Sequence, residues 1–128
     1  MNKQEIYAFL TAKGLWHEIT EHRAVYTVAE LSDIAVPYPE ANQTRPLSFA
    51  PESELLRILG LTAGSVTPFG ILNDAKREVK VFLDEDFFKA PGLIGVHPND
   101  NTATVWLKAK DLAGIIQEHG NELYLVQI

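Results

Sequence analysis

GLTAGSVTPFGILND, residues 60–74, ends one predicted helix, crosses a loop and enters an apolar run. Gly64, Pro68 and Gly70 do not suit a regular helix, because glycine costs backbone entropy and proline lacks an N–H group. Only small or β-branched residues lie between Gly64 and Pro68, so this loop can leave several backbone N–H groups pointing one way. Such a group of N–H donors suits an oxyanion or a carbonyl oxygen. The alternative is an ordinary helix-to-strand connection, which on composition alone is the commoner outcome.

Capping residues mark the predicted helices on either side of this loop. Asn2 and Glu5 have the spacing of a capping box at the start of the first helix. In the helix that precedes Gly60, the expected buried face consists of Leu55, Leu56 and Leu59. With their caps, the expected helices span residues 2–14, 27–36, 51–60 and 109–120, and a short helical turn is expected at 84–88.

Alternating apolar residues predict the strands. The clearest case is residues 102–107, where Ala103, Val105 and Leu107 fall on one face. The expected strands span residues 16–19, 47–49, 69–72, 78–83, 93–97, 102–107 and 123–128. Several links between strands are too short for helical crossovers, which favours an α+β fold with a mainly antiparallel or mixed sheet. We expect one domain over residues 1–128.

Composition narrows the class of protein. Hydrophobic residues make up 46% and charged residues 22% of the 128 residues, as in an ordinary soluble globule. The chain has no cysteine, which excludes disulfides, thiolate catalysis and Cys-ligated zinc and fits a cytoplasmic protein. The net charge of −6 disfavours a broad electrostatic grip on nucleic acid. We expect neither a signal peptide nor a membrane span.

Four segments together resemble one protein family. GSVTPFGILND (residues 64–74) resembles the Gly-x-x-x-Pro loop of the YbaK/ProRS-associated domain family, the trans-editing aminoacyl-tRNA deacylases. EHRAVYTVAEL (21–31), RPLSFAPESELLRILG (45–60) and GVHPNDNTATVWL (95–107) are similar to the stand-alone prolyl-tRNA editing branch, in the same order. Four ordered matches are a specific signal, whereas one alone is weak. The resemblance implies a curled mixed sheet with helices packed outside, and hydrolysis of an aminoacyl ester without a cofactor.

The sequence departs from the family's pattern between Ala41 and Asn42. Family members carry there a strand with a Lys-Asn pair, then a charged hairpin and a further helix, and that lysine is thought to help fix the substrate. None of this is present in the chain. The resemblance therefore leaves open a catalytically impaired module that binds tRNA or a synthetase without hydrolysing the ester.

His97 is the histidine with the strongest claim to a role in chemistry. It ends an apolar strand and precedes Pro98, so its side chain can lie at the mouth of a pocket. In the family, a His-Pro-x-x-Asn stretch lines the editing pocket, and here that stretch runs from His97 to Asn101. A histidine there can orient substrate or relay a proton. The alternative is a histidine that satisfies a turn by hydrogen bonding.

The resulting predictions combine loop amides with polar side chains. The residues predicted to be catalytic are Gly64, Ser65, Val66, Thr67 and His97. The residues predicted to bind substrate are Pro68, Phe69, Asn73, Asp74, Asn101 and His22. Asn73, Asp74 and Asn101 fit turn formation equally well. The four histidines are scattered, so no metal site is expected.

The resemblance also implies a substrate and a partner. The implied substrate is alanine wrongly attached to proline tRNA, with cysteine as the alternative acyl group. The implied partner is the acceptor end of that tRNA, and a prolyl-tRNA synthetase is left open as a second partner. Duplex DNA is not expected, because the chain is acidic and lacks a recognisable groove-reading element.

Overall fold

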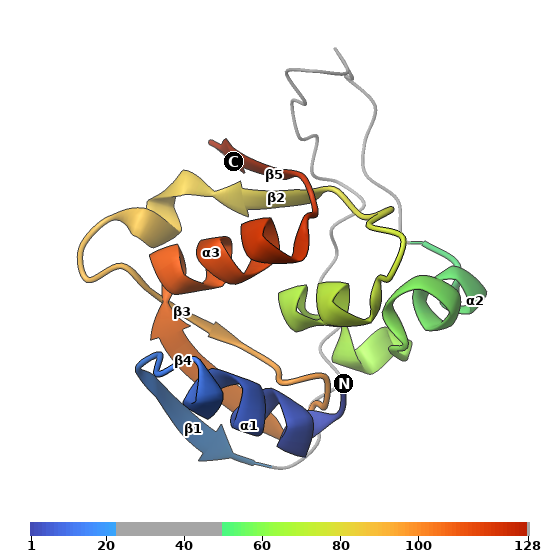
Figure 1. Ribbon diagram of the computed structural model, residues 1–128, viewed down its shortest axis with the longest axis horizontal. Helices are drawn as coiled ribbons and strands as arrows, with labels where there is room; N and C mark the ends of the chain where they lie inside the picture. Colours follow the sequence, from blue (N-terminus) through green and yellow to red (C-terminus); the bar gives the residue numbers. More distant parts are fainter. Residues whose placement is uncertain (23–49, 128) are drawn as a thin grey trace.

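The computed structural model describes residues 1–22 and 50–127 (Figure 1). Several predictions lie outside the described residues: the helix at 27–36, the strand at 47–49 and the departure from the family between Ala41 and Asn42. His22 and the loop at 60–74 lie within them.

The described strands form two sheets. In the three-stranded sheet, β4 (Ala103–Lys108) lies between β1 (His17–Glu21) and β3 (Leu93–Val96), and both pairings are antiparallel. In the two-stranded sheet, β2 (Val81–Asp84) pairs in parallel with β5 (Leu123–Val126). The predicted α+β class with antiparallel and mixed pairing is thus confirmed, with the strands divided between two ladders.

The two longest helices of the described residues begin and end where the sequence predicts. α1 (Lys3–Ala12) starts with the expected capping box: the Asn2 side chain accepts from the Glu5 N–H at 2.9 Å, and Glu5 accepts from the Asn2 N–H at 3.1 Å. α3 (Ala109–His119) ends at Gly120, whose φ of +102° is strained for residues with a side chain. α3 lies between the two sheets and contacts both β4 and β5 (Figure 1).

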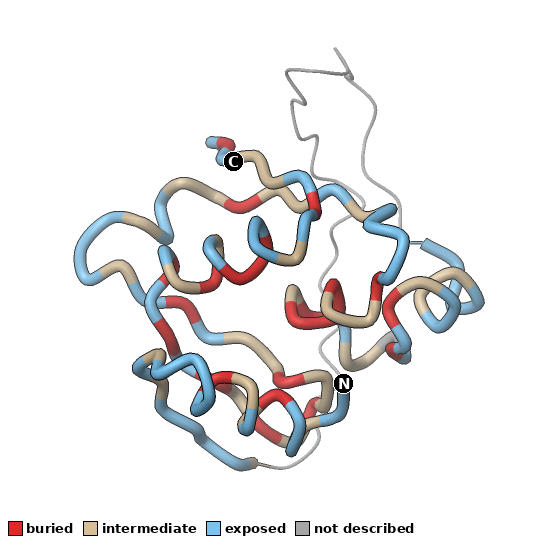
Figure 2. The backbone as a smooth tube through the Cα atoms, viewed as in Figure 1, coloured by how far each residue is buried: buried red, intermediate tan, exposed pale blue. Residues whose placement is uncertain are grey.

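The core forms between the inner face of β4 and the two helices. Ala103, Val105 and Leu107 are fully buried, as their alternation predicts. Figure 2 shows that buried segments of α1, α3 and the strands face one another. The helical and loop residues of this core include Ile6, Leu10, Phe69, Ile71, Leu112, Ile115 and Ile116.

The helix before Gly60 differs from the prediction. It comprises α2 (Glu52–Glu54) and a π-helical turn, η2 (Leu55–Leu59), of which only Leu59 is buried. Leu56 is 61% exposed, so its predicted place on the buried face is wrong. The π-helical turn is wider than an α-helical one, and it rotates successive side chains away from the face that a 3.6-residue period predicts.

The apolar run after the loop is a helix and not the predicted strand. η4 (Pro68–Asn73) is a 3-10 helix with Pro68 at its first position and with Phe69 and Ile71 buried. A short apolar run is ambiguous by periodicity, and here tertiary packing decides. Gly70 lies so close to Leu61 that a Cβ atom at this position would be 2.7 Å from the leucine side chain.

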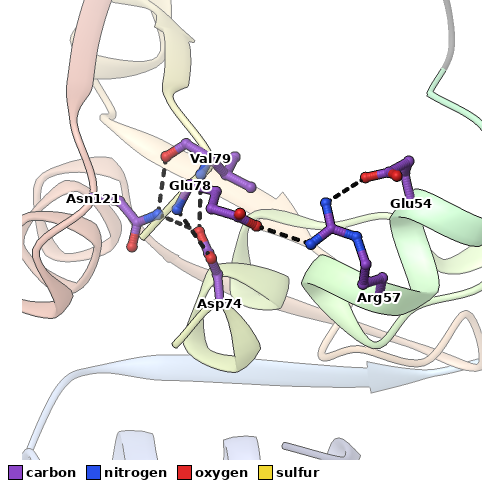
Figure 3. Close-up of polar contacts among 6 residues, drawn as sticks. All are labelled: Glu54, Arg57, Asp74, Glu78, Val79 and Asn121. Atoms are coloured by element: carbon purple, nitrogen blue, oxygen red, sulfur yellow. Dashed lines mark hydrogen bonds and ion pairs between the residues drawn. The ribbon is translucent and has the colours of Figure 1, made fainter. Parts of the chain in front are cut away.

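A buried carboxylate holds the segments that follow η4. Asp74 is only 2% exposed, and it accepts hydrogen bonds from the backbone N–H groups of Glu78 (3.1 Å) and Val79 (2.9 Å) and from the Asn121 side chain (2.8 Å; Figure 3). Because the amides of Glu78 and Val79 bind this carboxylate, strand β2 begins at Val81 and not at the predicted residue 78. Burial acts to raise the pKa of Asp74, but these hydrogen bonds outweigh it, and the net shift is downward.

Replacing the carboxylate tests how much stability this contact provides. We expect Asp74→Asn to lower the free energy of unfolding by about 2–3 kcal/mol, because the amide nitrogen cannot accept a backbone N–H and leaves a buried donor unsatisfied. Urea denaturation at neutral pH measures the loss. Asp86→Asn is the matched control, since Asp86 is exposed and its ion pair with Lys89 contributes little.

The pH dependence of stability gives a second test of the Asp74 carboxylate. The pKa of Asp74 is lowered in the folded state, so its contribution is present above the ordinary aspartate pKa of about 3.9 and is lost as the pH falls through the lowered value. The stability gap between the protein and Asp74→Asn should therefore narrow below about pH 4. A gap that stays constant down to pH 2 would contradict this role.

Candidate functional site

A small cavity lies where the Gly-x-x-x-Pro loop meets the end of β3. Its volume is about 170 Å³. It is lined by residues of the loop, of β3 and of β4: Val66, Thr67, Pro68, Gly95, Val96, His97 and Thr104. Thr104 alternates with the buried Ala103 and Val105, so the cavity lies on the outer face of the three-stranded sheet, away from the core.

Thr67 joins the loop to the strand end. Its hydroxyl donates a hydrogen bond of 2.5 Å to the carbonyl oxygen of His97, and the Thr67 side chain is buried. The two residues are far apart in sequence, so this bond fixes the loop against β3. Of the residues predicted to be catalytic, the structure brings Val66, Thr67 and His97 together around one cavity.

The His97 ring is held through one of its two nitrogens. Nδ1 lies 2.8 Å from the carbonyl oxygen of Ala103, and since a carbonyl only accepts, Nδ1 must donate its proton there. In the neutral ring, Nε2 then carries a lone pair. This arrangement leaves the reactive nitrogen as a hydrogen-bond acceptor or base.

A second histidine lies beside His97. The ring centroids of His22 and His97 are 5.9 Å apart, and His22 Nε2 lies 3.0 Å from the Thr104 hydroxyl. The His22 backbone N–H donates to the carbonyl oxygen of Thr102 at 2.8 Å, which extends the pairing of β1 with β4. His22 therefore adjoins the cavity through Thr104, at the same end of the sheet.

Some backbone N–H groups of the loop already donate hydrogen bonds within the protein, and others do not. The turn η3 (Ala63–Ser65) is a 3-10 helix in which the Ser65 N–H donates to the Thr62 carbonyl at 3.0 Å. Within residues 1–22 and 50–127, the backbone N–H groups of Gly64, Val66 and Thr67 have no hydrogen-bond acceptor. These three amides are left to bind a ligand oxygen, and two of them belong to the cavity-lining residues Val66 and Thr67.

Of the remaining predicted substrate-binding residues, one lines the cavity and others are held by contacts elsewhere in the fold. Pro68 lines the cavity, whereas Phe69 is fully buried in the core. Asn73 donates to the Leu59 carbonyl at 2.8 Å, and the Asp74 carboxylate is occupied by the contacts in Figure 3. Their contacts support structural roles, so the substrate role predicted for these three has no geometric support.

The turn after His97 is stabilised from within. Asp100 accepts from the Thr102 N–H at 2.9 Å and from the Thr102 hydroxyl, and these hydrogen bonds lower the pKa of the Asp100 carboxyl. Asn101 is buried in this turn and is absent from the cavity lining, so its predicted substrate role also lacks geometric support. The stabilised turn places Ala103, whose carbonyl holds the His97 ring, at the start of β4.

Gly95, Val96 and Thr104 line the cavity and were not predicted as site residues from the sequence. The alternation of residues 102–107 already placed Thr104 on the outer face, which was the available signal. Gly95 carries no chemical group that a sequence pattern would single out. Its place in the site follows from the pairing of β3 with β4.

The described part of the chain contains neither a metal-binding cluster nor a membrane-spanning helix. Across residues 1–22 and 50–127, no three His, Asp or Glu side chains converge as a metal site would require. None of the helices described there combines the length and the hydropathy needed to cross a bilayer.

Comparison with known proteins gives a domain and a relative. Residues 39–115, more than half of the chain, match the aminoacyl-tRNA editing domain. The prolyl-tRNA editing protein ProX of Acetoanaerobium sticklandii is 44% identical over 82 residues, which cover 64% of this chain and 49% of ProX. The chain thus spans about half the length of this curated relative.

Two solved structures share the fold at low sequence identity. The crystal structure of a hypothetical protein, APE2540, gives a TM-score of 0.57 at 13% identity and covers 98% of this chain and 99% of that one. A scaffold from work on epitope backbone grafting by computational design gives 0.52 at 18% identity, with 98% and 96% covered. These likenesses support the fold alone. The domain match confirms the family resemblance of the sequence: the chain belongs to the aminoacyl-tRNA editing domain family.

Proposed function

We propose that this protein hydrolyses the ester bond of an amino acid wrongly attached to proline tRNA, with alanine as the preferred acyl group. Membership of the editing-domain family and the likeness to ProX support the reaction class. The observation that carries the proposal is the small cavity that His97 lines together with Val66, Thr67 and Pro68 of the Gly-x-x-x-Pro loop.

Ester hydrolysis requires a base for the attacking water, a proton for the ribose leaving group and hydrogen-bond donors that stabilise the oxyanion. A water molecule attacks the carbonyl carbon of the ester while His97 Nε2 accepts one of its protons. The backbone N–H groups of Gly64 and Thr67 donate to the developing oxyanion. When the bond between the carbonyl carbon and the ribose oxygen breaks, the ribose oxygen takes the proton from His97. The free amino acid and an intact tRNA result.

Size limits which acyl group fits the cavity. Its volume of about 170 Å³ and the apolar side chains of Val66 and Pro68 favour a short acyl group. A small pocket rejects side chains that cannot enter, but a hydrophobic pocket discriminates weakly between groups that differ by one atom. Cysteine therefore stays the alternative to alanine. We place the reaction at the acceptor end of tRNA in the cytoplasm, and association with prolyl-tRNA synthetase remains a prediction.

A deacylation assay tests the function. We expect the protein to release alanine from mischarged proline tRNA faster than cysteine, and to leave correctly attached proline in place. His97→Ala should lower kcat/KM by about 100-fold, the usual scale for loss of a general base. Gly64→Ala should also slow release, because it adds a methyl group beside the amide that faces the oxyanion.

The matched control for the assay is His17→Ala. His17 also holds a backbone carbonyl through Nδ1, that of Leu15 at 2.8 Å, but it does not line the cavity. Its variant should keep full activity. If the protein bound the tRNA tightly but released no amino acid, it would be a binding module and not a deacylase. The departure from the family pattern after Ala41 left this alternative open.

The tautomer of His97 is a separate and more local test. We expect neutral His97 to carry its proton on Nδ1, because that atom faces the Ala103 carbonyl. Long-range ¹H–¹⁵N NMR spectra of the neutral imidazole rings distinguish the two tautomers. His17 has the same contact and provides an internal reference. A proton on Nε2 of His97 would remove the base from the mechanism.

A further inference from the structure

Trp106 is a large aromatic side chain left open on the outer face of the sheet. It is 42% exposed although it lies on β4, the central strand. The residues on either side of it along the chain, Val105 and Leu107, are fully buried. Core packing therefore explains its neighbours, whereas much of the Trp106 side chain stays open to solvent.

A glycine on the adjacent strand holds the ring flat against the sheet. Gly95 is paired directly with Trp106, and a Cβ atom at Gly95 would lie 2.8–2.9 Å from three atoms of the indole ring. Any larger residue would push the ring away from this position. The ring is thus supported on one side by the backbone of β3, as a stacking surface would be.

The supported ring borders the proposed active site. Gly95 lines the cavity and also contacts Trp106. Thr104, two residues before Trp106 on the same face of β4, lines the cavity as well. An acyl group in the cavity is joined through its ester to a terminal ribose, so the base of that nucleotide must lie within a few ångströms of the cavity.

The charges on this face favour one path for the nucleotide's phosphate. Lys108, two residues beyond Trp106 and on the same face, is exposed. Glu18, the partner of Trp106 on the opposite strand, is exposed and acidic. A phosphate is attracted toward Lys108 and repelled from β1, which gives an acidic chain a local cationic contact.

We propose that Trp106 is the platform on which the base of the 3′-terminal nucleotide of the tRNA stacks while its ester lies beside His97. This inference rests on the proposed function and adds a substrate-binding residue to it. Every nucleobase has a π-face, and stacking on an aromatic side chain is a common way to hold an unpaired nucleotide. Gly95 supports the ring. Lys108 lies beside the path of the phosphate that joins the terminal nucleotide to the nucleotide before it.

The first experiment compares two substitutions of Trp106 in the deacylation assay. We expect Trp106→Ala to raise KM for mischarged proline tRNA by about 10-fold, the scale of one lost base–aromatic stack, and to change kcat less. Trp106→Phe should restore KM to within about 3-fold, because phenylalanine still stacks. Trp16→Ala is the matched control: Trp16 is 44% exposed, is the other tryptophan of the chain and directly precedes β1, across β4 from Gly95 and the cavity. An unchanged KM in Trp106→Ala would overturn the proposal.

The second experiment separates this inference from the proposed function. Trp16→Phe leaves Trp106 as the single tryptophan, so its fluorescence reports on stacking. The probe is an uncharged RNA hairpin ending in CCA, compared with the same hairpin lacking the terminal adenosine. We expect the CCA hairpin to quench the emission and to bind about 10-fold more tightly. Equal quenching and affinity for the two hairpins would overturn the stacking role even if the protein deacylates tRNA. Selective quenching without deacylation would retain Trp106 as a platform and reject the deacylase.

Discussion

Burial of one carboxylate constrains much of this structure. Asp74 lies out of water, and an ionised carboxylate there is tolerated only when its oxygens receive hydrogen bonds. The donors come from Glu78, Val79 and Asn121, so the end of η4, the approach to β2 and the approach to β5 are held at one point (Figure 3). Because Pro68 lies at the other end of η4, the anchored helix also sets the position of the cavity wall.

The candidate site uses backbone groups in two ways. The carbonyl oxygens of His97 and Ala103 are satisfied within the fold, by the Thr67 hydroxyl and by the His97 ring. In the described residues, the groups of the site left without a partner are His97 Nε2 and the N–H groups of Gly64, Val66 and Thr67, which are one acceptor and three donors. An ester in water-assisted hydrolysis needs both kinds of group, which is why this cavity suits the editing-domain family.

The two faces of the three-stranded sheet have different surroundings: one packs in the core and the other carries the cavity. Alternation along β4 sends Val105 into the core and places Thr104 and Trp106 on the outer face, where Thr104 lines the cavity. Core packing and the proposed binding surface are therefore encoded by alternate residues of one strand. A substitution on the outer face can change recognition with little effect on the core, and this makes Trp106 a sensitive place to test the proposal.

Local signals in the sequence determined the capping of α1, the ends of α3 and the inner face of β4, because each depends on residues within a few positions of one another. The four ordered motifs also determined the family and led to His97 and the loop. Only the tertiary structure decided that residues 68–73 are helical, that Asp74 is a structural anchor, and that Gly95 belongs to the site. The reason is that each of these depends on contacts between segments distant in sequence, which no local periodicity records.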